Sequence, residues 1–320
     1  MTPEEWVTVV EREYLGSFVR QGGASVKFAA ATTDAGRTEV QQRLIATGDS
    51  QGFQCVTLNA TEVRLHRIEQ LFHAVACQVD WDGVARAFVE RLLRARGLRL
   101  PPVDEPLSVV RLAELNAGPE VLLRNELRGA LAQELFEDYA MTREFRLAMF
   151  ALCAAQLDPT DNPALEASIK QWLRGELRLV SQVKRALIFQ KIARHNARHM
   201  LFSLAHWLTL TGKSGLLLVL DIARYAEAVR PALRGEGYYY STSATIDLYE
   251  VLRQLIDATD EAHSCFVAVL AAADFLQLQL QHTGRGIRSY QALYFRIWDD
   301  VYDRTRENPF SSLVRIAGAA

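Results

Sequence analysis

The stretch best suited to chemistry covers residues 31–38, which read Ala-Thr-Thr-Asp-Ala-Gly-Arg-Thr. A phosphate-binding loop has the pattern GxxxxGK[ST]. Its glycines let backbone N–H groups approach the phosphates, its Lys contacts the β- and γ-phosphates, and its Ser or Thr holds Mg²⁺. Gly36 and Thr38 match this pattern, while Arg37 replaces Lys and Asp34 places a negative charge beside the expected phosphate. The stretch therefore predicts a degenerate nucleotide-binding loop.

An apolar run that ends in an acid supplies the second element of such a site. Gly215–Asp221 reads GLLLVLD, a pattern typical of a central parallel strand that is covered on both faces. In a Walker B motif the terminal Asp orders Mg²⁺, and a following Glu polarises the attacking water. Asp221 fits the first role, whereas Ile222 stands where the Glu should be. Together the two motifs predict a nucleotide site that keeps its layout without its catalytic groups.

Two further positions bear on phosphate chemistry. The strand predicted at Cys265–Ala271 continues into Ala272 and Ala273, so the polar sensor residue that ends this strand in AAA+ ATPases is missing. In a later turn, Arg285 and Arg288 lie beside glycines and suit a phosphate or a carboxylate on a neighbouring protein. Two solvated surface arginines are the alternative interpretation.

The remaining clusters carry less chemistry. Thr211–Ser214 contains Gly-Lys-Ser, but it ends a predicted helix and precedes a strand, which is the reverse of a phosphate-binding loop, so Gly212 is interpreted as a helix C-cap. His195 and His199 share one helix face, yet no third ligand is evident and no metal site is predicted. The four cysteines occur singly, without CxxC spacing, and are interpreted as reduced thiols.

The elements that must position these motifs alternate between strand and helix. Val26–Ala31 is a predicted strand, Arg37–Thr47 a helix and Phe53–Asn59 a second strand, after an amphipathic helix at Glu4–Val19. Strand, helix and strand in this order form a βαβ unit, which implies a parallel sheet. The predicted fold class is α/β, an AAA+-like P-loop parallel sheet with a large all-helical insertion.

The helical insertion sets the expected domain organisation. Residues 61–212 are almost all helical in period and rich in Leu, Ala, Arg and Glu, so they are expected to interrupt the α/β core. Residues 1–60 hold the N-terminal helix and the first part of that core. Residues 213–320 hold the second part with a C-terminal helix at Tyr290–Thr305, and Asn308–Ala320 is expected to be a short tail.

A basic segment within the insertion offers an alternative function. Leu177–Leu210 is predicted to be helical, and basic residues recur along residues 178–198 of this helix. Lys184, Arg185 and Lys191 are its candidates for contact with DNA phosphates. An ordinary solvated helix face has the same composition, so the pattern leaves both interpretations open.

Composition excludes several classes of protein. The chain has 320 residues, of which 49% are hydrophobic and 23% charged, and its formal net charge is −2. These values are ordinary for a globular protein and provide no global basic field for nucleic acid or an anionic membrane. No apolar run approaches the roughly 18 residues of a transmembrane helix, and the first ten residues lack a signal-peptide pattern. A cytoplasmic protein without a membrane partner is expected.

The order of these parts resembles one known family. It is similar to the P-loop ATP-binding proteins of the BREX phage-defence systems, the BrxC/BrxD-like branch of the AAA+ ATPases. The similarity rests on the loop and strands of the first half, on the large helical insertion, and on two stretches near the end of the chain. The loop and strands are Lys27–Val40, Gly52–Asn59 and Gly215–Asp221, and the two stretches near the end are Tyr249–Leu276 and Arg285–Ile297.

The resemblance implies an ATPase-fold component of a bacterial antiviral complex that works beside other defence proteins, among them an active AAA+ ATPase. Members that hydrolyse ATP should carry Gly-Lys-Ser/Thr, Asp-Glu and a polar sensor. Here the matching positions read Gly36-Arg37-Thr38, Asp221-Ile222 and Ala271–Ala273. Our hypothesis is a pseudo-ATPase. The alternatives are a working ATPase that binds ATP and Mg²⁺, and a DNA-binding adaptor.

Overall fold

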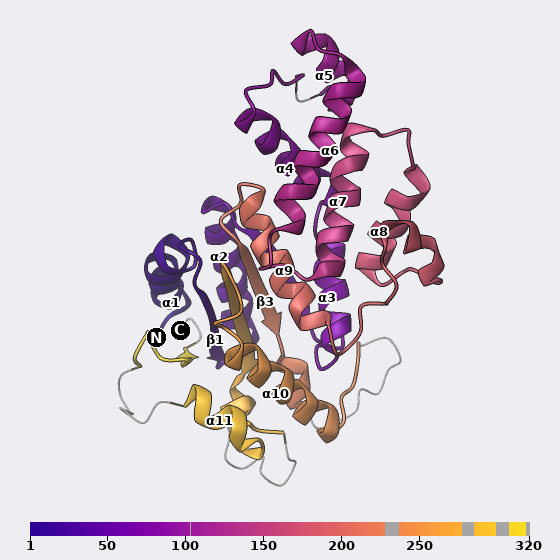
Figure 1. The fold of residues 1–320 in the computed structure, drawn as a ribbon. Helices are drawn as coiled ribbons and strands as arrows, with labels where there is room; N and C mark the ends of the chain where they lie inside the picture. The colour runs from indigo at the N-terminus through magenta and orange to yellow at the C-terminus, as the bar shows by residue number, and fades with distance from the viewer. Residues whose placement is uncertain (103, 228–236, 277–284, 299–306, 318–320) are drawn as a thin grey trace. The chain divides into compact units, whose positions relative to one another are not determined.

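The computed structural model describes the chain except for residues 103, 228–236, 277–284, 299–306 and 318–320. It divides into two compact units, both drawn in Figure 1. The first unit joins residues 1–75 to residues 213–320 and contains the sheet, and the second unit consists of residues 76–212. Residues 61–75, predicted from the sequence to belong to the insertion, therefore pack with the sheet-containing unit.

The first unit is built on a five-stranded sheet in the order β2-β3-β4-β1-β5. Every neighbouring pair is parallel. The strands are β1 (Ala24–Ala31), β2 (Gln54–Asn59), β3 (Leu216–Asp221), β4 (Cys265–Ala272) and β5 (Leu313–Ile316). This sheet confirms the predicted α/β P-loop-like class, and β4 separates the strand before the candidate loop from the strand that ends in Asp221.

Helices cover both faces of the sheet. Packed on one face are α1 (Pro3–Val9), the π-helix η1 (Val10–Phe18) and α2 (Asp34–Ser50), which enclose a core with Ala29 of β1. On the other face, α10 (Thr242–Asp257) and the 3₁₀-helix η4 (Ala273–Leu276) lie against β1. There the ring of Phe275 stacks on Phe28, with centroids 6.2 Å apart. Because side chains alternate along a strand, neighbouring Phe28 and Ala29 serve opposite faces.

The C-terminal part of the first unit differs from the sequence-based expectation. The predicted tail contains β5, which pairs with β1 in register from Phe28↔Leu313 to Ala31↔Ile316. The predicted helix at Tyr290–Thr305 begins as α11 (Gln291–Ile297), and residues 299–306 lie outside the described part of the chain. β1 is therefore flanked by β4 and β5, and the candidate loop begins at an interior strand of the sheet.

The second unit is helical and centred on α7. Packed against α7 (Arg143–Leu157) are α4, α6, α8 and α9. The bounds are α4 Trp81–Ala95, α5 Val109–Asn116, α6 Glu120–Phe136, α8 Pro163–Arg174 and α9 Ala197–Leu210, and α3 (Ile68–Cys77) crosses the boundary between the units. Most residues of α9 are buried, and its Trp207 ring lies 4.6 Å from that of Phe88 on α4.

The predicted basic helix over residues 178–198 is not formed. The segment holds the short 3₁₀-helix η2 (Val180–Ala186), then a stretch without regular structure, and α9 begins only at Ala197. A left-handed backbone at Leu187 (φ 59°) ends η2 and breaks the helical path. Lys184, Arg185 and Lys191 are exposed, but they do not line one helix face.

Two absences hold for the described residues. None of their helices combines the length and the apolar character that a membrane crossing needs. Nor do any three of their His, Cys, Asp or Glu side chains come together as metal ligands. The pair His195 and His199 therefore gains no third ligand within this part of the chain.

The entry into β3 gives a stability prediction. Gly215 has φ 133°, and a Cβ built on it would lie 2.1 Å from the backbone oxygen of Ser264, which accepts a hydrogen bond from Leu216 N. Gly215→Ala should therefore lower the free energy of unfolding by about 3 kcal/mol or more in urea denaturation, since both the backbone and the strand pairing must shift.

Gly212→Ala is the matched control for this prediction. Gly212 also has a positive φ, 89°, but a Cβ there would meet nothing within 4 Å. Gly212→Ala should therefore lower the free energy of unfolding only by the left-handed backbone penalty of about 1 kcal/mol. Equal losses for the two variants would show that the close approach to Ser264 does not matter.

Candidate nucleotide-binding site

The parallel sheet brings the two sequence motifs to one edge. In a parallel sheet all carboxyl ends lie at the same edge, where α/β proteins bind ligands. Ala31 pairs with Ala272 and Asp221 with Leu270, so β1 and β3 end at nearly the same level of β4. The predicted site residues Gly36, Arg37 and Thr38 follow β1 at this edge.

The connection between β1 and α2 is much shorter than a loop that wraps phosphates. β1 ends at Ala31 and α2 begins at Asp34, which leaves only Thr32 and Thr33 between them. Thr33 caps the helix, because its Oγ1 accepts a hydrogen bond from Gly36 N at 3.1 Å. Its carbonyl oxygen accepts the Arg37 N–H at 3.1 Å. Two N–H groups of the candidate loop are thus used inside the helix.

Arg37 joins the two motifs through ion pairs. Its Nε donates to Asp221 Oδ2 at 2.9 Å, and its Nη1 donates to Asp34 Oδ1 at 2.7 Å. The Arg37 and Asp221 side chains are only 14% and 10% exposed, whereas Asp34 is 90% exposed. The cation at the position of the P-loop lysine is therefore directed at carboxylates of its own chain.

The electrostatics of this triad favour the ion pair. Burial alone would lower the pKa of the Arg37 guanidinium, but the charge of Asp221 and the hydrogen bonds to Asp221 and Asp34 raise the pKa above its ordinary value. A carboxylate beside a partly buried guanidinium experiences less screening than at the open surface. Arg37 is therefore held between two acids, with its charge already balanced.

Asp221 is further held by its surroundings. Its Oδ1 accepts a hydrogen bond from Ala223 N at 3.0 Å, and its Oδ2 accepts a longer one from Asn59 Nδ2 at 3.5 Å. The next residue, Ile222, is 2% exposed, and its N–H donates to Leu270 O. The position of the water-polarising Glu therefore carries an apolar side chain buried in the unit.

The end of β4 offers no close substitute for a sensor. Ala272 and Ala273 continue from β4 into η4, and the first polar side chain after them is Asp274, which is exposed. A carboxylate at this level would repel phosphate rather than contact it. The residues at this strand end are alanines, so they supply no hydroxyl or amide side chain.

A triphosphate does not fit the arrangement of these residues. The two-residue turn leaves no loop to surround a phosphate, and the Arg37 cation is neutralised by Asp34 and Asp221. Asp34 also places its charge in the first turn of α2, where the helix dipole would otherwise attract an anion. Thr38 retains an exposed hydroxyl, but Asp221, its expected partner in holding Mg²⁺, is engaged by Arg37.

The two candidate arginines of the later turn have different environments. Arg285 is 4% exposed and donates to the carbonyl oxygens of Tyr225 and Tyr240 at 3.1 and 2.7 Å. Its guanidinium therefore forms hydrogen bonds with the backbone of its own chain. This burial differs from the sequence-based expectation that Arg285 contacts a phosphate or a neighbouring protein. Arg288, on the 3₁₀-helix η6 (Ile287–Ser289), is exposed and lies over the ring of Tyr294 at 5.5 Å.

Sequence reasoning missed the residues that complete this edge. The short helix η3 (Ala223–Ala226) carries Tyr225, whose ring stacks on Tyr240 with centroids 3.8 Å apart. Tyr240 Oη donates to Ala60 O, which ties the end of β2 to the same cluster. Tyr240 ends the run Tyr238–Tyr240, but the run alone does not indicate this packing, because Tyr225 and Ala60 lie elsewhere along the chain.

The comparisons with known proteins identify one family. Residues 14–318 match the family described as BREX system ATP-binding protein BrxC/D. The match covers the sheet-containing unit almost completely and the whole helical unit. No curated protein and no solved structure matches the chain.

The ion pair between Arg37 and Asp221 gives a testable prediction. Arg37→Met keeps much of the side-chain volume but leaves the mostly buried carboxylate of Asp221 without its cation. The free energy of unfolding should fall by about 2–4 kcal/mol in urea denaturation, because an unpaired buried charge is strongly unfavourable.

Arg12→Met is the matched control, since Arg12 pairs with Glu13 at the surface, where the side chains are 69% and 40% exposed. It should change stability by about 0.5 kcal/mol or less. The double variant Arg37→Met with Asp221→Leu should recover part of the loss, because no charge then stays buried. Equal effects of Arg37→Met and Arg12→Met would contradict the role given to the pair.

Proposed function

The chain belongs to the family of the BREX system ATP-binding protein BrxC/D, and we propose that it is an AAA+-like subunit of a bacterial phage-defence complex that does not hydrolyse ATP itself. The observation that carries the proposal is the double ion pair of Arg37 with Asp34 and Asp221. It supports a pseudo-ATPase, because the cation at the lysine position is committed within the chain.

Three independent features of the site support the same conclusion. The turn before α2 has two residues, the position of the water-polarising acid holds the buried Ile222, and the end of β4 is built from alanines. Loss of the acid alone would leave an enzyme that binds ATP without turnover. The short turn also disfavours binding, since phosphate recognition depends on close approach of backbone N–H groups.

Assembly with other subunits is the second part of the proposal. A retained AAA+-like sheet without turnover suits a structural role beside other BREX proteins, among them an active AAA+ relative. Arg288 is the residue proposed to reach that relative's nucleotide, because it is exposed whereas Arg285 is buried. A cytoplasmic location for this complex is part of the proposal.

A working ATPase is the competing function within the same family. The retained Gly36, Thr38 and Asp221 favour it, since they are the glycine, hydroxyl and carboxylate of a nucleotide site. Hydrolysis would require Arg37 to release Asp221. It would also require another acidic residue to polarise the attacking water, because Ile222 stands where that Glu is expected. The DNA-binding adaptor has less support, because the basic helix on which it depends is not formed.

Calorimetric titration with ATP and Mg²⁺ tests the absence of a nucleotide site. The wild-type chain should give no binding tighter than about 1 mM, and Thr38→Ala should leave the titration unchanged because no site is lost. Micromolar binding that Thr38→Ala abolishes would overturn the pseudo-ATPase and favour the working enzyme.

Arg288→Ala tests the proposed contact with an active relative. In the purified complex, ATP hydrolysis by the partner should fall at least about tenfold, since an arginine supplied in trans stabilises the transition-state charge. Arg12→Ala, an exposed arginine elsewhere on the same unit, should leave the rate unchanged. Full activity of the Arg288→Ala complex would remove this arginine from the mechanism.

A further inference from the structure

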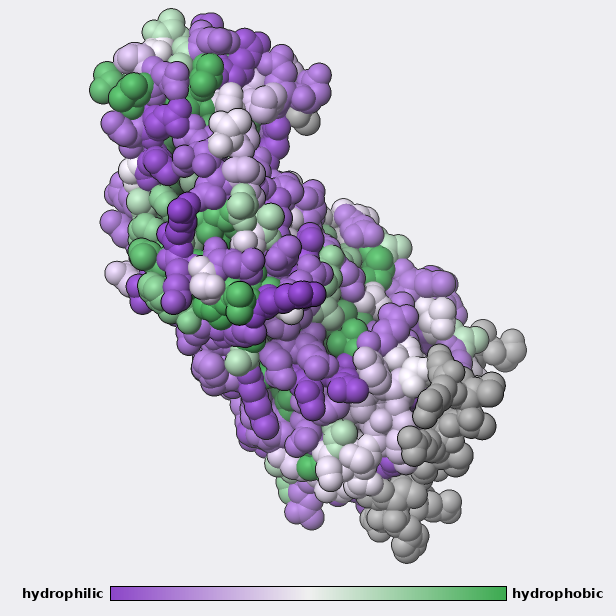
Figure 2. All heavy atoms as spheres, turned by 90° about the vertical axis from the view of Figure 1, so that its right-hand side faces the viewer, coloured by the Kyte–Doolittle hydropathy of each residue, from purple (hydrophilic) through white to green (hydrophobic). Residues whose placement is uncertain are grey.

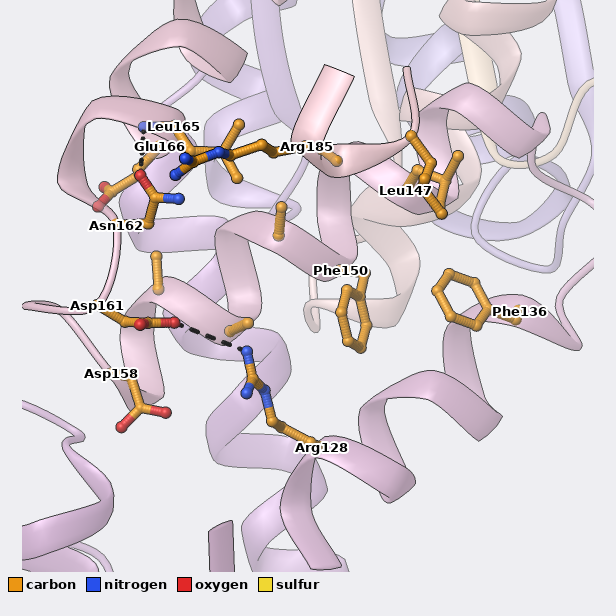
Figure 3. Close-up of a pocket in the computed structure, with 15 residues that line it drawn as sticks. Arg128, Phe136, Leu147, Phe150, Asp158, Asp161, Asn162, Leu165, Glu166 and Arg185 are labelled. Atoms are coloured by element: carbon orange, nitrogen blue, oxygen red, sulfur yellow. Dashed lines mark hydrogen bonds and ion pairs between the residues drawn. The ribbon is translucent and has the colours of Figure 1, made fainter. Parts of the chain in front are cut away.

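The helical unit has a groove of about 420 Å³ between α6, α7, α8 and η2. Figure 3 shows the rings of Phe136 and Phe150 side by side at one end of it. Figure 2 shows hydrophobic surface among hydrophilic atoms on the side of the molecule where α8 lies. Charges of both signs line the groove, on three acids and two bases: Asp158, Asp161, Glu166, Arg128 and Arg185. Its charge therefore selects no one kind of partner, unlike the surroundings of Arg288 on the other unit.

Arg288 lies over two aromatic rings. Its guanidinium carbon, Cζ, is 5.5 Å from the ring centroid of Tyr294 and 5.8 Å from that of Trp298. The two rings stack on each other, with centroids 5.1 Å apart and planes inclined by 29°. Trp298 N donates to Tyr294 O at 3.0 Å, which keeps the two residues one helical turn apart. Because a cation within about 6 Å of a ring centroid is attracted by the ring, both rings hold the guanidinium.

The backbone under this aromatic pair is fixed to the core. Figure 1 shows α11 beside α10, and the two helices contact each other. Leu293 of α11 is buried, and Arg296 Nη2 donates to Asp257 Oδ2 of α10 at 2.9 Å. Ile287, the residue before Arg288, is also buried. Both the short helix that carries the arginine and the helix that carries the rings are therefore held in place.

The N–H groups of the Arg288 side chain are not used within the described residues. The acids of α10 are matched by other arginines, since Glu250 pairs with Arg253 at 2.6 Å and Asp257 with Arg296. Arg288 is exposed, and its side chain forms neither an ion pair nor a hydrogen bond with a described residue. Contact with the rings leaves its five N–H groups for an oxygen ligand from another molecule.

This arrangement suits recognition of a phosphate. A guanidinium presents its N–H groups as a planar fork that matches phosphate oxygens. A solvated arginine loses much of its side-chain freedom when it binds such a group, whereas packing against rings restricts that freedom before binding. The two rings therefore prepare Arg288 for an anion that arrives from outside the chain.

We propose that Tyr294 and Trp298 are positioning residues that hold Arg288 ready for the phosphate oxygens of a nucleotide bound by a neighbouring subunit. This proposal rests on the proposed function, in which Arg288 reaches that nucleotide. The rings touch no reacting atom and act only through the guanidinium. Because Arg288 stabilises charge in the transition state, loss of its position should lower kcat of the neighbouring ATPase and change KM little.

Two substitutions at Tyr294 separate the ring from the hydroxyl. In the purified complex, Tyr294→Leu should lower kcat for ATP hydrolysis at least about threefold, with KM within about twofold of wild type. Tyr294→Phe should keep the wild-type kcat, because the ring remains and the hydroxyl bonds to no described residue. Phe310→Leu removes another ring of the same unit, which is 50% exposed, and should leave kcat unchanged.

A double-mutant cycle shows whether the ring acts through Arg288. In the Arg288→Ala background, Tyr294→Leu should cause no further loss of kcat, because the group that the ring positions is gone. The chain without its partners gives a second readout by NMR with isotope-labelled arginine. Ring currents should shift the Cδ–H signals of Arg288 in the wild type and in Tyr294→Phe. In Tyr294→Leu these signals should move toward those of a solvated arginine.

Four results would overturn the proposal. Full kcat in Arg288→Ala would remove the contact with the neighbour's nucleotide, and the positioning role with it. A loss in Arg288→Ala with full kcat in Tyr294→Leu would remove the positioning role alone. A further loss from Tyr294→Leu in the Arg288→Ala background would show that the ring acts on folding or assembly. A loss that saturating amounts of the partner restore would assign Arg288 to a carboxylate at the subunit contact.

Discussion

The ion pair between Arg37 and Asp221 links the two halves of the sheet-containing unit. Arg37 lies in the first turn of α2 after β1, and Asp221 ends β3, 184 positions away in the sequence. The helical unit separates these motifs along the chain, yet the parallel sheet returns them to one edge. Because both side chains are mostly buried, each depends on the other for its charge to be balanced.

This constraint connects the fold to the proposed function. A nucleotide would need the same cation and the same carboxylate that now satisfy each other, and it would meet the exposed charge of Asp34. The turn capped by Thr33 is compatible with the ion pair, since it begins the helix early and directs Arg37 towards β3. The proposed loss of catalysis and the stability of this edge therefore have one physical origin.

Much of the fold could be predicted from the sequence, because buried parallel strands are continuous apolar runs. β3 and β4 are recognisable in this way, and the loop residues follow from their spacing. β5 was not predictable, since it has only four residues, Leu-Val-Arg-Ile, and gains its order by pairing with β1. The pairing of Arg37 with Asp221 is likewise non-local, because it depends on β4 lying between their strands.

The basic segment shows how tertiary contacts override local pattern. Its composition favours a helix, but the indole N–H of Trp172 donates to Gln190 O at 3.0 Å and holds the chain in an irregular path. The buried Val183 and Ile188 are five residues apart, which is not a helical period. Lys184 and Arg185 are therefore exposed without lying on one regular helix face, an arrangement that the residue types alone did not indicate.

A crystal structure of the chain grown in excess ATP and Mg²⁺ tests the proposed commitment of Arg37 most directly. We expect Arg37 Nε to stay against Asp221, with no triphosphate over residues 36–38. A β-phosphate held by the N–H of Gly36, with Arg37 withdrawn from Asp221 and turned to the nucleotide, would contradict the proposal and assign the site to a working ATPase.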